Sequence, residues 1–543
     1  MQEIREILKE AVRKLFGIDF EPEVTVAPEN VKADYSSNVA LKLAKELHKS
    51  PMEIAEGIIK KTGASVSPPG FINFVLPDEL IRKQIGELER DFDGFVQSDE
   101  FKGKTVVCEF SDPNPFKVLH VGHLYTSVVG DAIARLFEYA GARVVRANFG
   151  GDVGLHVAKT IYVLRQKDLS ELGIEDIAKC YVEGTRLYDE NEKVNKEITE
   201  LNKEIYQINA EEVHGTELSE LYWRARELSY EYFKEFYATI GVKFDKYYPE
   251  SIVAGLGLKI VKEQLAKGVY EKSEGAVVFD GEKYGLHTRV FINKEGVPTY
   301  ETKDVGLIFT KWEDWHFDKS VVITGSEQLD YMKVVLKSVE QYAPELTERT
   351  VHLTHGLVKL PGGVKMSSRK GNFLKAVDVL EMVAEELKSQ YDSEDKKVSL
   401  AATKYAFLKY KMGGNIIFDP KESVKMTGNS GPYLLYSCVR AKKILMNYKG
   451  RKEKDTIYNS DERGLAMKVL EYREVLREAV GEMAPHKLAN YLYELAQEFS
   501  RFYEKCPVVG SEREAERMGL VKAYLDMMIH GLNLLGIEIP EEM

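Results

Sequence analysis

The segment between residues 105 and 149 limits the fold of this chain more than any other. Thr105 to Phe110 and Arg143 to Phe149 have strand character, and Leu124 to Tyr139 between them has helical character. This order predicts a βαβ unit, in which a helix joins two parallel strands. The tetrapeptide His120-Val-Gly-His123 stands where the first strand passes into the helix.

Two histidines at this position suit a phosphate ligand. The first N–H groups of a helix lack partners within the helix, and its dipole favours negative charge there. Permanent cations would be poorly placed at this end, whereas neutral histidines can donate hydrogen bonds to a polyphosphate. We therefore expect His120 and His123 to bind a nucleotide.

A second motif, Lys365-Met366-Ser367-Ser368-Arg369, follows two further predicted strands, Ser320–Thr324 and Thr350–His355. Its lysine and hydroxyl groups could neutralise charge on a departing pyrophosphate. Alone, the first motif could be a turn with a capping histidine and the second a solvated loop. Together, in this order and context, they resemble the plan of the class I aminoacyl-tRNA synthetases.

Length and composition indicate a soluble multidomain protein. A chain of 543 residues is expected to form two to four domains, and 44% of the residues are apolar. No apolar run approaches the ~18 residues of a membrane span, and the first residues lack the apolar core of a signal peptide. The cysteines are far apart, so we expect no zinc site, no disulfide framework and a cytoplasmic location. They are Cys108, Cys180, Cys438 and Cys506.

Net charge does not decide whether the chain binds RNA. The value of −12 argues against a general nucleic-acid binder, but affinity depends on local basic patches. One basic cluster either contacts RNA or is a solvated helix end and loop. Its members are Arg440, Lys442, Lys443, Lys449, Arg451, Lys452 and Lys454.

The predicted fold class is multidomain α/β. Residues 1–100 form a small α/β domain that opens with an amphipathic helix. Residues 101–393 form a Rossmann-like parallel-sheet catalytic domain with a helical insertion at about 155–290, and a predicted helix Ala376–Tyr391 ends it. Residues 394–543 form a C-terminal α-helical bundle, because helical patterns there, one of them running from Glu462 to Val480, follow one another at short separations.

Several residues near the nucleotide motifs suit a cationic amino-acid substrate. A guanidinium group is planar, carries five donors and needs carboxylates and oriented acceptors. Glu109, Asn114, Tyr300 and Asp304 supply these, and the last two lie one helical turn apart. Glu109 could instead be a paired carboxylate at a strand end, and Asp304 a helix cap.

The run Glu109-Phe-Ser-Asp-Pro-Asn114-Pro-Phe-Lys117-Val-Leu-His120-Val-Gly-His123-Leu resembles the arginyl-tRNA synthetase signature. Further matches extend over essentially the whole chain. They are Gly130-Asp131, Arg135, Asn148, Gly151-Asp152, Gly154, Tyr300-x-Thr302-x-Asp304, Glu327-Gln328, Gly70-Phe-Ile-Asn73-Phe-Val-Leu and Asn429-x-x-x-Tyr433-x-x-Tyr436-x-x-x-Arg440.

This resemblance implies an arginine–tRNA ligase that makes arginyl-adenylate from L-arginine and ATP. The arginyl group then passes to the 3′-terminal ribose of tRNA(Arg), and AMP and pyrophosphate are released. Mg²⁺ would accompany ATP without a protein metal site, and we expect a monomer.

The resemblance also implies roles for individual residues. Arginine would be bound by Glu109, Asn114, His120, Tyr300, Asp304 and Gln328. ATP would be bound by His120, Gly122, His123, Lys365, Met366, Ser367 and Ser368. The groups acting in catalysis would be His120, His123, Lys117 and Lys365. The residues contacting tRNA would be Asn73, Tyr433, Tyr436 and Arg440.

The sequence departs from the family pattern at four places. Tyr125 replaces a common arginine, Val153 a common tryptophan and Tyr331 a common histidine, and Arg369 follows the two serines. Lys117 resembles a lysine thought to compensate for changes in the second motif, and Arg369 or Lys370 could contribute. These changes leave open which of Lys117, Lys365, Arg369 and Lys370 bind the phosphates of ATP.

Two other interpretations compete with this one. A nucleotidyltransferase that ignores RNA would need neither the N-terminal module nor the C-terminal bundle. A non-catalytic tRNA-binding paralogue would have no reason to keep His120, His123, Lys365, Glu109 and Asp304.

Overall fold

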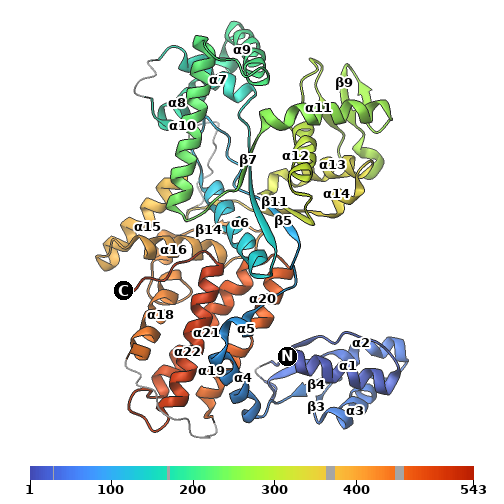
Figure 1. Ribbon diagram of the computed structural model, residues 1–543, viewed down its shortest axis with the longest axis vertical. Helices are drawn as coiled ribbons and strands as arrows, with labels where there is room; N and C mark the ends of the chain where they lie inside the picture. Colours follow the sequence, from blue (N-terminus) through green and yellow to red (C-terminus); the bar gives the residue numbers. More distant parts are fainter. Residues whose placement is uncertain (29, 168–171, 363–373, 447–457) are drawn as a thin grey trace. The chain divides into compact units, whose positions relative to one another are not determined.

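The computed structural model describes residues 1–28, 30–167, 172–362, 374–446 and 458–543, which form two compact units (Figure 1). One comprises Met1–Val96, Arg440–Arg477 and Tyr491–Ile529, and the other Gln97–Val439, Glu478–Asn490 and His530–Met543. No helix within the described ranges is long and apolar enough to cross a membrane.

The N-terminal part of the first unit is an antiparallel sheet, in the order β1-β2-β4-β3, packed against helices. The predicted opening helix is present, with Ile4, Leu8 and Val12 buried on one face. The elements are α1 (Gln2–Phe16), β1 (Val24–Val26), β2 (Tyr35–Ser37), α2 (Val39–Leu47), α3 (Pro51–Thr62), β3 (Ser65–Ser67), β4 (Phe71–Phe74), α4 (Asp78–Arg90) and α5 (Phe92–Val96).

The C-terminal part of the chain is helical, as predicted. Its helices are α18 (Gly431–Met446), α19 (Ser460–Leu470), α20 (Tyr472–Gly481), α21 (Pro485–Lys505) and α22 (Glu514–Leu534). We expected one helix from Glu462 to Val480, but the helix is interrupted at Glu471. The break accompanies the burial of Tyr472, whose ring centroid lies 5.5 Å from that of Tyr491.

Charged hydrogen bonds join the two sequence-distant parts of the first unit. The guanidinium of Arg463 on α19 donates to both carboxylate oxygens of Asp34, at 2.6 and 2.8 Å, and to Asp78 at 2.9 Å. Arg5 on α1 makes a two-pronged contact with Glu474 on α20, at 2.7 and 2.8 Å. Such two-pronged pairs fix orientation as well as distance.

The second unit contains a five-stranded parallel sheet in the order β12-β11-β5-β6-β7. The predicted βαβ unit is present as β5, α6 and β6, so the Rossmann-like expectation is confirmed. Its elements are β5 (Thr105–Glu109), α6 (Val121–Tyr139), β6 (Arg143–Gly150), β7 (Lys246–Pro249), β11 (Lys319–Gly325) and β12 (Thr350–His355).

The chain runs outward from β5 in both directions across this sheet. The strands β6 and β7 lie on one side of β5, and β11 and β12, which come much later in the sequence, lie on the other. In open parallel sheets, ligands bind beyond the carboxyl ends of the strands where the order reverses. The carboxyl end of β5, at Glu109, is such a point.

Helices follow β6 and return the chain to the sheet. The first four, α7 to α10, build their own apolar core. The strand β7 falls inside the predicted insertion but belongs to the core sheet, so the inserted residues form two separate segments. The four helices are α7 (Leu155–Leu164), α8 (Ile174–Glu190), α9 (Glu192–Ala210) and α10 (Glu217–Thr239).

The chain after β7 forms a small antiparallel sheet and further helices. A small antiparallel sheet, β10-β9-β8, packs with α11 and α12. The elements are α11 (Glu250–Ala266), β8 (Glu271–Ser273), β9 (Ala276–Phe279), η1 (Gly281–Tyr284), β10 (Arg289–Ile292), α12 (Tyr300–Trp315), η2 (Ser326–Gln328), α13 (Leu329–Glu340), α14 (Pro344–Glu348), β13 (Val358–Lys359), α15 (Ala376–Tyr391), α16 (Lys396–Leu408), β14 (Ile416–Ile417) and α17 (Pro420–Ser423).

Two glycines let α11 and α12 approach closely. A Cβ atom at Gly257 would overlap the carbonyl oxygen of Thr302, and one at Gly306 would overlap that of Val253. The two backbones therefore touch where the helices cross. This contact sets the position of α12, the helix that begins at Tyr300 and carries Asp304.

Substituting alanine at this crossing should destabilise the second unit. Gly257→Ala should lower the free energy of unfolding by about 1–3 kcal/mol, because the added methyl group forces the helices apart. Urea unfolding followed by tryptophan fluorescence suits the measurement, since Trp312 and Trp315 lie on α12.

Gly255→Ala is the matched control on the same helix. Gly255 is exposed, and its added Cβ would meet no atom within 4 Å. Alanine there should raise stability by about 0.5–1 kcal/mol through its higher helix propensity. Equal effects of the two substitutions would contradict the proposed role of the crossing.

Candidate active site

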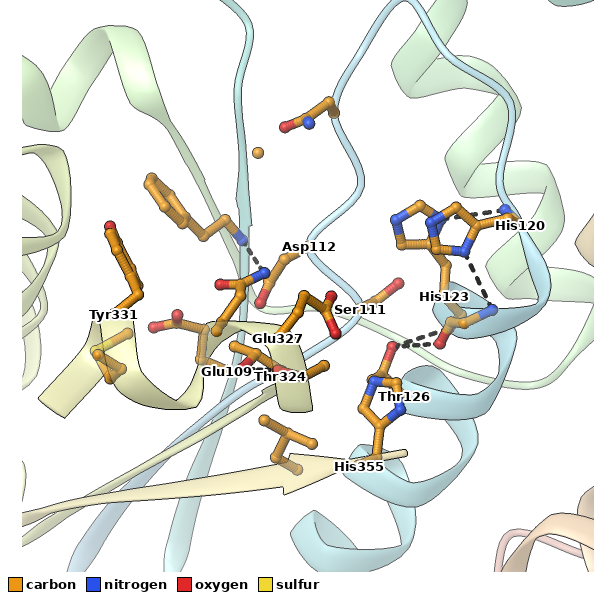
Figure 2. Close-up of a pocket in the computed structure, with 18 of the residues that line it drawn as sticks. Glu109, Ser111, Asp112, His120, His123, Thr126, Thr324, Glu327, Tyr331 and His355 are labelled. Atoms are coloured by element: carbon orange, nitrogen blue, oxygen red, sulfur yellow. Dashed lines mark hydrogen bonds between the residues drawn. The ribbon is translucent and has the colours of Figure 1, made fainter. Parts of the chain in front are cut away.

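A cavity of about 700 Å³ opens at the carboxyl edge of the parallel sheet, within the second unit. Eight residues predicted to bind arginine or ATP line it together, although they come from separate parts of the sequence. They are Glu109, Asn114, His120, Gly122, His123, Tyr300, Asp304 and Gln328. Figure 2 shows the two imidazoles at one end of the cavity, with Glu109 and Tyr331 toward the other.

The imidazoles of His120 and His123 cap the N-terminus of α6. His120 Nδ1 accepts a hydrogen bond from the Gly122 N–H at 3.1 Å, and His123 Nδ1 accepts one from the His120 N–H at 3.2 Å. The two rings stack, with centroids 3.7 Å apart (Figure 2). The capping-histidine interpretation of this motif is therefore correct, and it is compatible with a ligand site.

These contacts fix the chemical state of both rings. Because each Nδ1 accepts a backbone N–H, the neutral ring must carry its proton on Nε2 and can donate from there. Burial lowers the pKa of His120 to about 4, and burial together with His120 lowers the pKa of His123 well below its ordinary value. The pair thus offers hydrogen-bond donors without a permanent charge, as the sequence suggested.

Glu109, at the end of β5, lines the cavity but is not free. Its Oε2 forms a buried ion pair with Lys311 of α12, and Lys311 Nζ also donates to Ser320 Oγ at 3.2 Å. The alternative that Glu109 is a paired strand-end carboxylate therefore holds for this oxygen. Lys311 was not among the expected site residues, because nothing in the local sequence reports a partner 202 residues away.

Asp304 lies inside the cavity and is not a helix cap, since α12 has Thr299 at its N-cap position. Its Oδ2 accepts a hydrogen bond from the hydroxyl of Tyr331 on α13. Burial raises the pKa of Asp304 to about 8, with Glu109 adding to the rise and the Tyr331 hydrogen bond opposing it. Tyr300, one turn earlier, is exposed at the rim.

Asn114 and Gln328 supply amide groups on opposite sides of the sheet centre. Asn114 Oδ1 accepts a hydrogen bond from the Gly151 N–H at 2.7 Å, which ties the turn after β5 to the end of β6. Gln328 closes η2, directly after β11. Both line the cavity.

The cavity also contains residues that sequence reasoning missed. Asp112 accepts a hydrogen bond from the Phe149 N–H at 2.8 Å, and Ser111 and Asp112 have positive φ angles of 73° and 50°. Glu250, the first residue of α11, pairs with Lys303 of α12. The position after a central strand could have indicated Asp112, whereas Glu250 is visible only in three dimensions. Arg289, Glu327 and His355 complete this group.

Lys117 is not among the lining residues. Its Nζ lies 4.2 Å from the ring centroid of Tyr181 on α8. The second motif, Lys365 to Arg369, and Lys370 fall outside the described residues. Lys359 before it and Leu374 after it both line the cavity.

Leu374 and its neighbours are joined to the first motif through the backbone. The Val121 N–H donates to the Leu374 carbonyl oxygen, and the Ala376 N–H donates to that of Leu119, both at 2.9 Å. The segment after the second motif is thereby fixed to the start of α6.

The residues predicted to contact tRNA differ in accessibility. Asn73 on β4 is buried and uses its amide within the sheet, accepting from Ser36 Oγ and donating to Ser67 Oγ, each at 2.9 Å. A direct contact of this side chain with tRNA would require these bonds to break. Tyr436 on α18 is exposed, and Tyr433 is partly exposed.

Arg440 lies 4.9 Å from the ring centroid of Tyr503, in the first unit. The remainder of the predicted basic cluster is only partly described. Lys449, Arg451, Lys452 and Lys454 fall outside the described residues, and Lys442 and Lys443 lie on α18.

Two of the four departures from the family pattern, Tyr125 and Val153, lie in packed parts of the second unit. Tyr125 is buried, and its ring packs edge-on against His355 and Phe407, with centroids 5.0 and 5.5 Å away. Val153 is buried in the core formed by the inserted helices. Neither replacement adds a charge to the cavity.

The parallel sheet, the neutral histidine pair at the start of α6 and the acidic opposite end define a class I aminoacyl-tRNA synthetase. A model of this class, described as "tRNA synthetases class I (R), catalytic domain", matches residues 91–419. Residues 434–543 match the "DALR anticodon binding domain", and residues 2–76 the "Arginyl tRNA synthetase N terminal domain". The chain belongs to the arginyl-tRNA synthetase family.

Relatives of full length agree with this assignment. The arginine–tRNA ligase of Clostridium acetobutylicum is 28% identical over 99% of this chain and 100% of its own length. That of Fusobacterium nucleatum is 29% identical, over 100% of this chain and 99% of its own length.

Solved structures share the fold. Thermus thermophilus arginyl-tRNA synthetase superposes with a TM-score of 0.83 at 24% identity, covering 100% of both chains. The Plasmodium falciparum enzyme superposes with a TM-score of 0.82 at 21% identity, covering 100% of this chain and 99% of that one. The multidomain α/β fold class is thereby confirmed, while the predicted boundaries at residues 100 and 393 stay predictions.

Both imidazoles should remain neutral throughout the physiological pH range. A histidine with a lowered pKa gains its proton only when the pH falls to that lower value, which is about 4 for His120. The ¹⁵N shifts of both rings should therefore stay those of the Nε2–H tautomer down to about pH 5. Titration of either ring near its ordinary pKa would contradict this electrostatic description.

Proposed function

We propose that this cavity joins L-arginine to ATP and transfers the arginyl group to tRNA(Arg). One observation carries the proposal: a buried carboxylate, Asp304, shares a single cavity with two neutral imidazoles at a helix N-terminus. The first suits a cationic side chain and the second a polyphosphate.

Arginine is held by its two ends. The guanidinium group pairs with Asp304, with Tyr300 at the rim and Glu109 nearby. Asn114 and Gln328 orient the amino-acid backbone, and His120 lies between this site and the nucleotide. Their common position in the cavity supports this division.

ATP occupies the other end, against the start of α6. The Nε2–H groups of His120 and His123 donate to its phosphates, and Gly122 leaves room for the adenine. A Cβ at Gly122 would come within 2.9 Å of the His120 ring, so the space there is tight. Lys365, Met366, Ser367 and Ser368 complete the ATP site, with Lys117 as a further cation.

The reaction needs no side-chain nucleophile. The arginine carboxylate attacks the α-phosphate of ATP, and the bond to pyrophosphate breaks to give arginyl-adenylate. The terminal ribose hydroxyl of tRNA then attacks the activated carbonyl and releases AMP. The protein contributes positioning and electrostatic stabilisation of the transition states.

Mg²⁺ accompanies ATP in this proposal. No group of three or more His, Cys, Asp or Glu in the described part of the chain could hold a metal ion. Oxygen ligands from the phosphates suit Mg²⁺, which would supply charge neutralisation there. Zinc has no role in the proposed reaction.

Selection against lysine follows from the same geometry. A guanidinium can form two parallel hydrogen bonds with the Asp304 carboxylate, whereas an ammonium is a point charge. Lysine would leave buried acceptors unpaired, and such losses discriminate strongly between substrates.

Apart from its 3′ end, which must reach the arginyl-adenylate, the tRNA is bound outside this cavity. The match to an anticodon-binding domain over residues 434–543 supports an anticodon contact, with exposed Tyr436 suited to stacking on an unpaired base. Tyr433 and Arg440 belong to the same proposed surface, and Asn73 supports the N-terminal sheet. We propose a monomer that works in the cytoplasm.

Attachment of labelled arginine to tRNA tests the proposed function directly. Arginine, and none of the other amino acids, should be attached to total tRNA in the presence of ATP and Mg²⁺. His120→Ala should reduce the rate by at least ~100-fold, because it removes a donor to the reacting phosphates. His214→Ala is the control, since His214 stacks on Trp223 outside the cavity. Normal activity of His120→Ala would exclude the ATP role.

Asp304→Asn tests the guanidinium site. Asparagine can still accept the Tyr331 hydrogen bond but has no charge, so the arginine KM should rise roughly 10- to 150-fold. Asp314→Asn is the matched control on the same helix, where Asp314 accepts a hydrogen bond from Tyr248 at 2.8 Å. An unchanged arginine KM in Asp304→Asn would remove this residue from the site.

A further inference from the structure

Three buried carboxylates line the cavity, and they are not equivalent. Glu109 forms an ion pair with Lys311, and Glu250 forms one with Lys303. Asp304 is also buried, but among the described residues no lysine or arginine forms an ion pair with it. Its Oδ2 instead accepts a hydrogen bond from the Tyr331 hydroxyl.

The ring of Tyr331 is itself held in place. The guanidinium carbon of Arg289, on β10, lies 5.5 Å from the ring centroid. Arg289 Nη1 lies 3.5 Å from Glu301 Oε1 on α12, the helix that carries Asp304. Tyr331, on α13, therefore contacts Arg289 of β10 through its ring and Asp304 of α12 through its hydroxyl. Figure 2 places it at the acidic end of the cavity.

We propose that Tyr331 is a positioning and specificity residue, whose hydroxyl holds the Asp304 carboxylate for the guanidinium group of arginine. The inference rests on the proposed function and adds to it a residue that does not touch the reacting atoms.

The hydrogen bond from Tyr331 affects whether Asp304 is ionised, because the surroundings of Asp304 otherwise favour its protonated form. Burial and the neighbouring Glu109 and Glu250 carboxylates favour a protonated, neutral Asp304, while Lys311 and Tyr331 oppose this, and its pKa is raised to about 8. Burial and Asp304 raise the pKa of Tyr331 well above its ordinary value, so its hydroxyl keeps the proton that it donates.

Removal of the hydroxyl should therefore weaken recognition of a charged substrate. Without the Tyr331 donor the pKa of Asp304 rises further, and a neutral carboxylic acid no longer attracts guanidinium. A neutral acid can, however, donate a hydrogen bond to a urea oxygen. Tyr331 thus favours arginine over citrulline, its neutral urea analogue.

The test compares Tyr331→Phe with the wild type in steady-state aminoacylation of tRNA. The arginine KM should rise ~10-fold with little change in kcat, because a hydrogen bond to a charged group is lost. Citrulline, as a competitive inhibitor, should bind no more weakly than to the wild type. Tyr270→Phe is the control, because it removes a buried hydroxyl that is hydrogen-bonded to Ser338 outside the cavity. It should change neither the arginine KM nor the affinity for citrulline.

The pH profile gives a second readout that a general loss of packing would not move. In the wild type, kcat/KM for arginine should rise as the pH passes about 8, since Asp304 becomes ionised above its pKa. In Tyr331→Phe the midpoint should lie at higher pH. The double variant should have an arginine KM close to that of Asp304→Asn alone, because the two residues act as one unit.

The outcomes separate this inference from the proposed function. A wild type that attaches no arginine would overturn the proposed function itself. If Asp304→Asn is impaired but Tyr331→Phe matches the wild type in KM and pH midpoint, the role of Tyr331 is overturned alone. Additive effects of the two substitutions on the arginine KM would likewise overturn it, and so would equal losses of affinity for arginine and citrulline.

Discussion

The parallel pairing of β5 with strands from two distant parts of the chain is the constraint on which the site depends. Its neighbours are β6, which follows α6, and β11, which comes some two hundred residues later. Glu109 ends β5, Asn114 follows it, and Gln328 follows β11. Without this pairing the two ends of the cavity would belong to unconnected segments.

Charge balance in the cavity follows from the same arrangement. The helix α12 lies beside β5 and contributes Lys303, Asp304 and Lys311. Its two lysines pair with the buried carboxylates of Glu250 and Glu109, while Asp304 adds a carboxylate. An isolated buried charge is costly, but a paired one is tolerated. The cavity is therefore acidic at the point where a cationic substrate can complete the balance.

Much of the fold could be predicted from the sequence, because periodicity and motif order are local properties. The predicted strand Thr350–His355 and helix Ala376–Tyr391 have the bounds seen in the structure. The break at Glu471 was missed, since the helical pattern continues across it and only packing around Tyr472 accompanies the interruption.

The sequence named many of the residues that line the cavity, but it did not reveal the contacts between them. Motif residues such as His120 and Asp304 could be named from spacing and family resemblance. The ion pair of Glu109 with Lys311 could not, because it links residues on different elements. Tyr331 was visible only as a departure from the family pattern, and its contact with Asp304 gives the departure a physical meaning.

The close crossing of α11 and α12 has a consequence for changing the substrate range. Because Gly257 and Gly306 let the two backbones touch, they help to set the distance between α11, which begins at Glu250, and α12, which carries Asp304. A single methyl group at Gly306 would push α12 away from α11 and so move Asp304 relative to the parallel sheet. Attempts to admit longer or shorter guanidines could therefore begin at this crossing, with the carboxylate itself left unchanged.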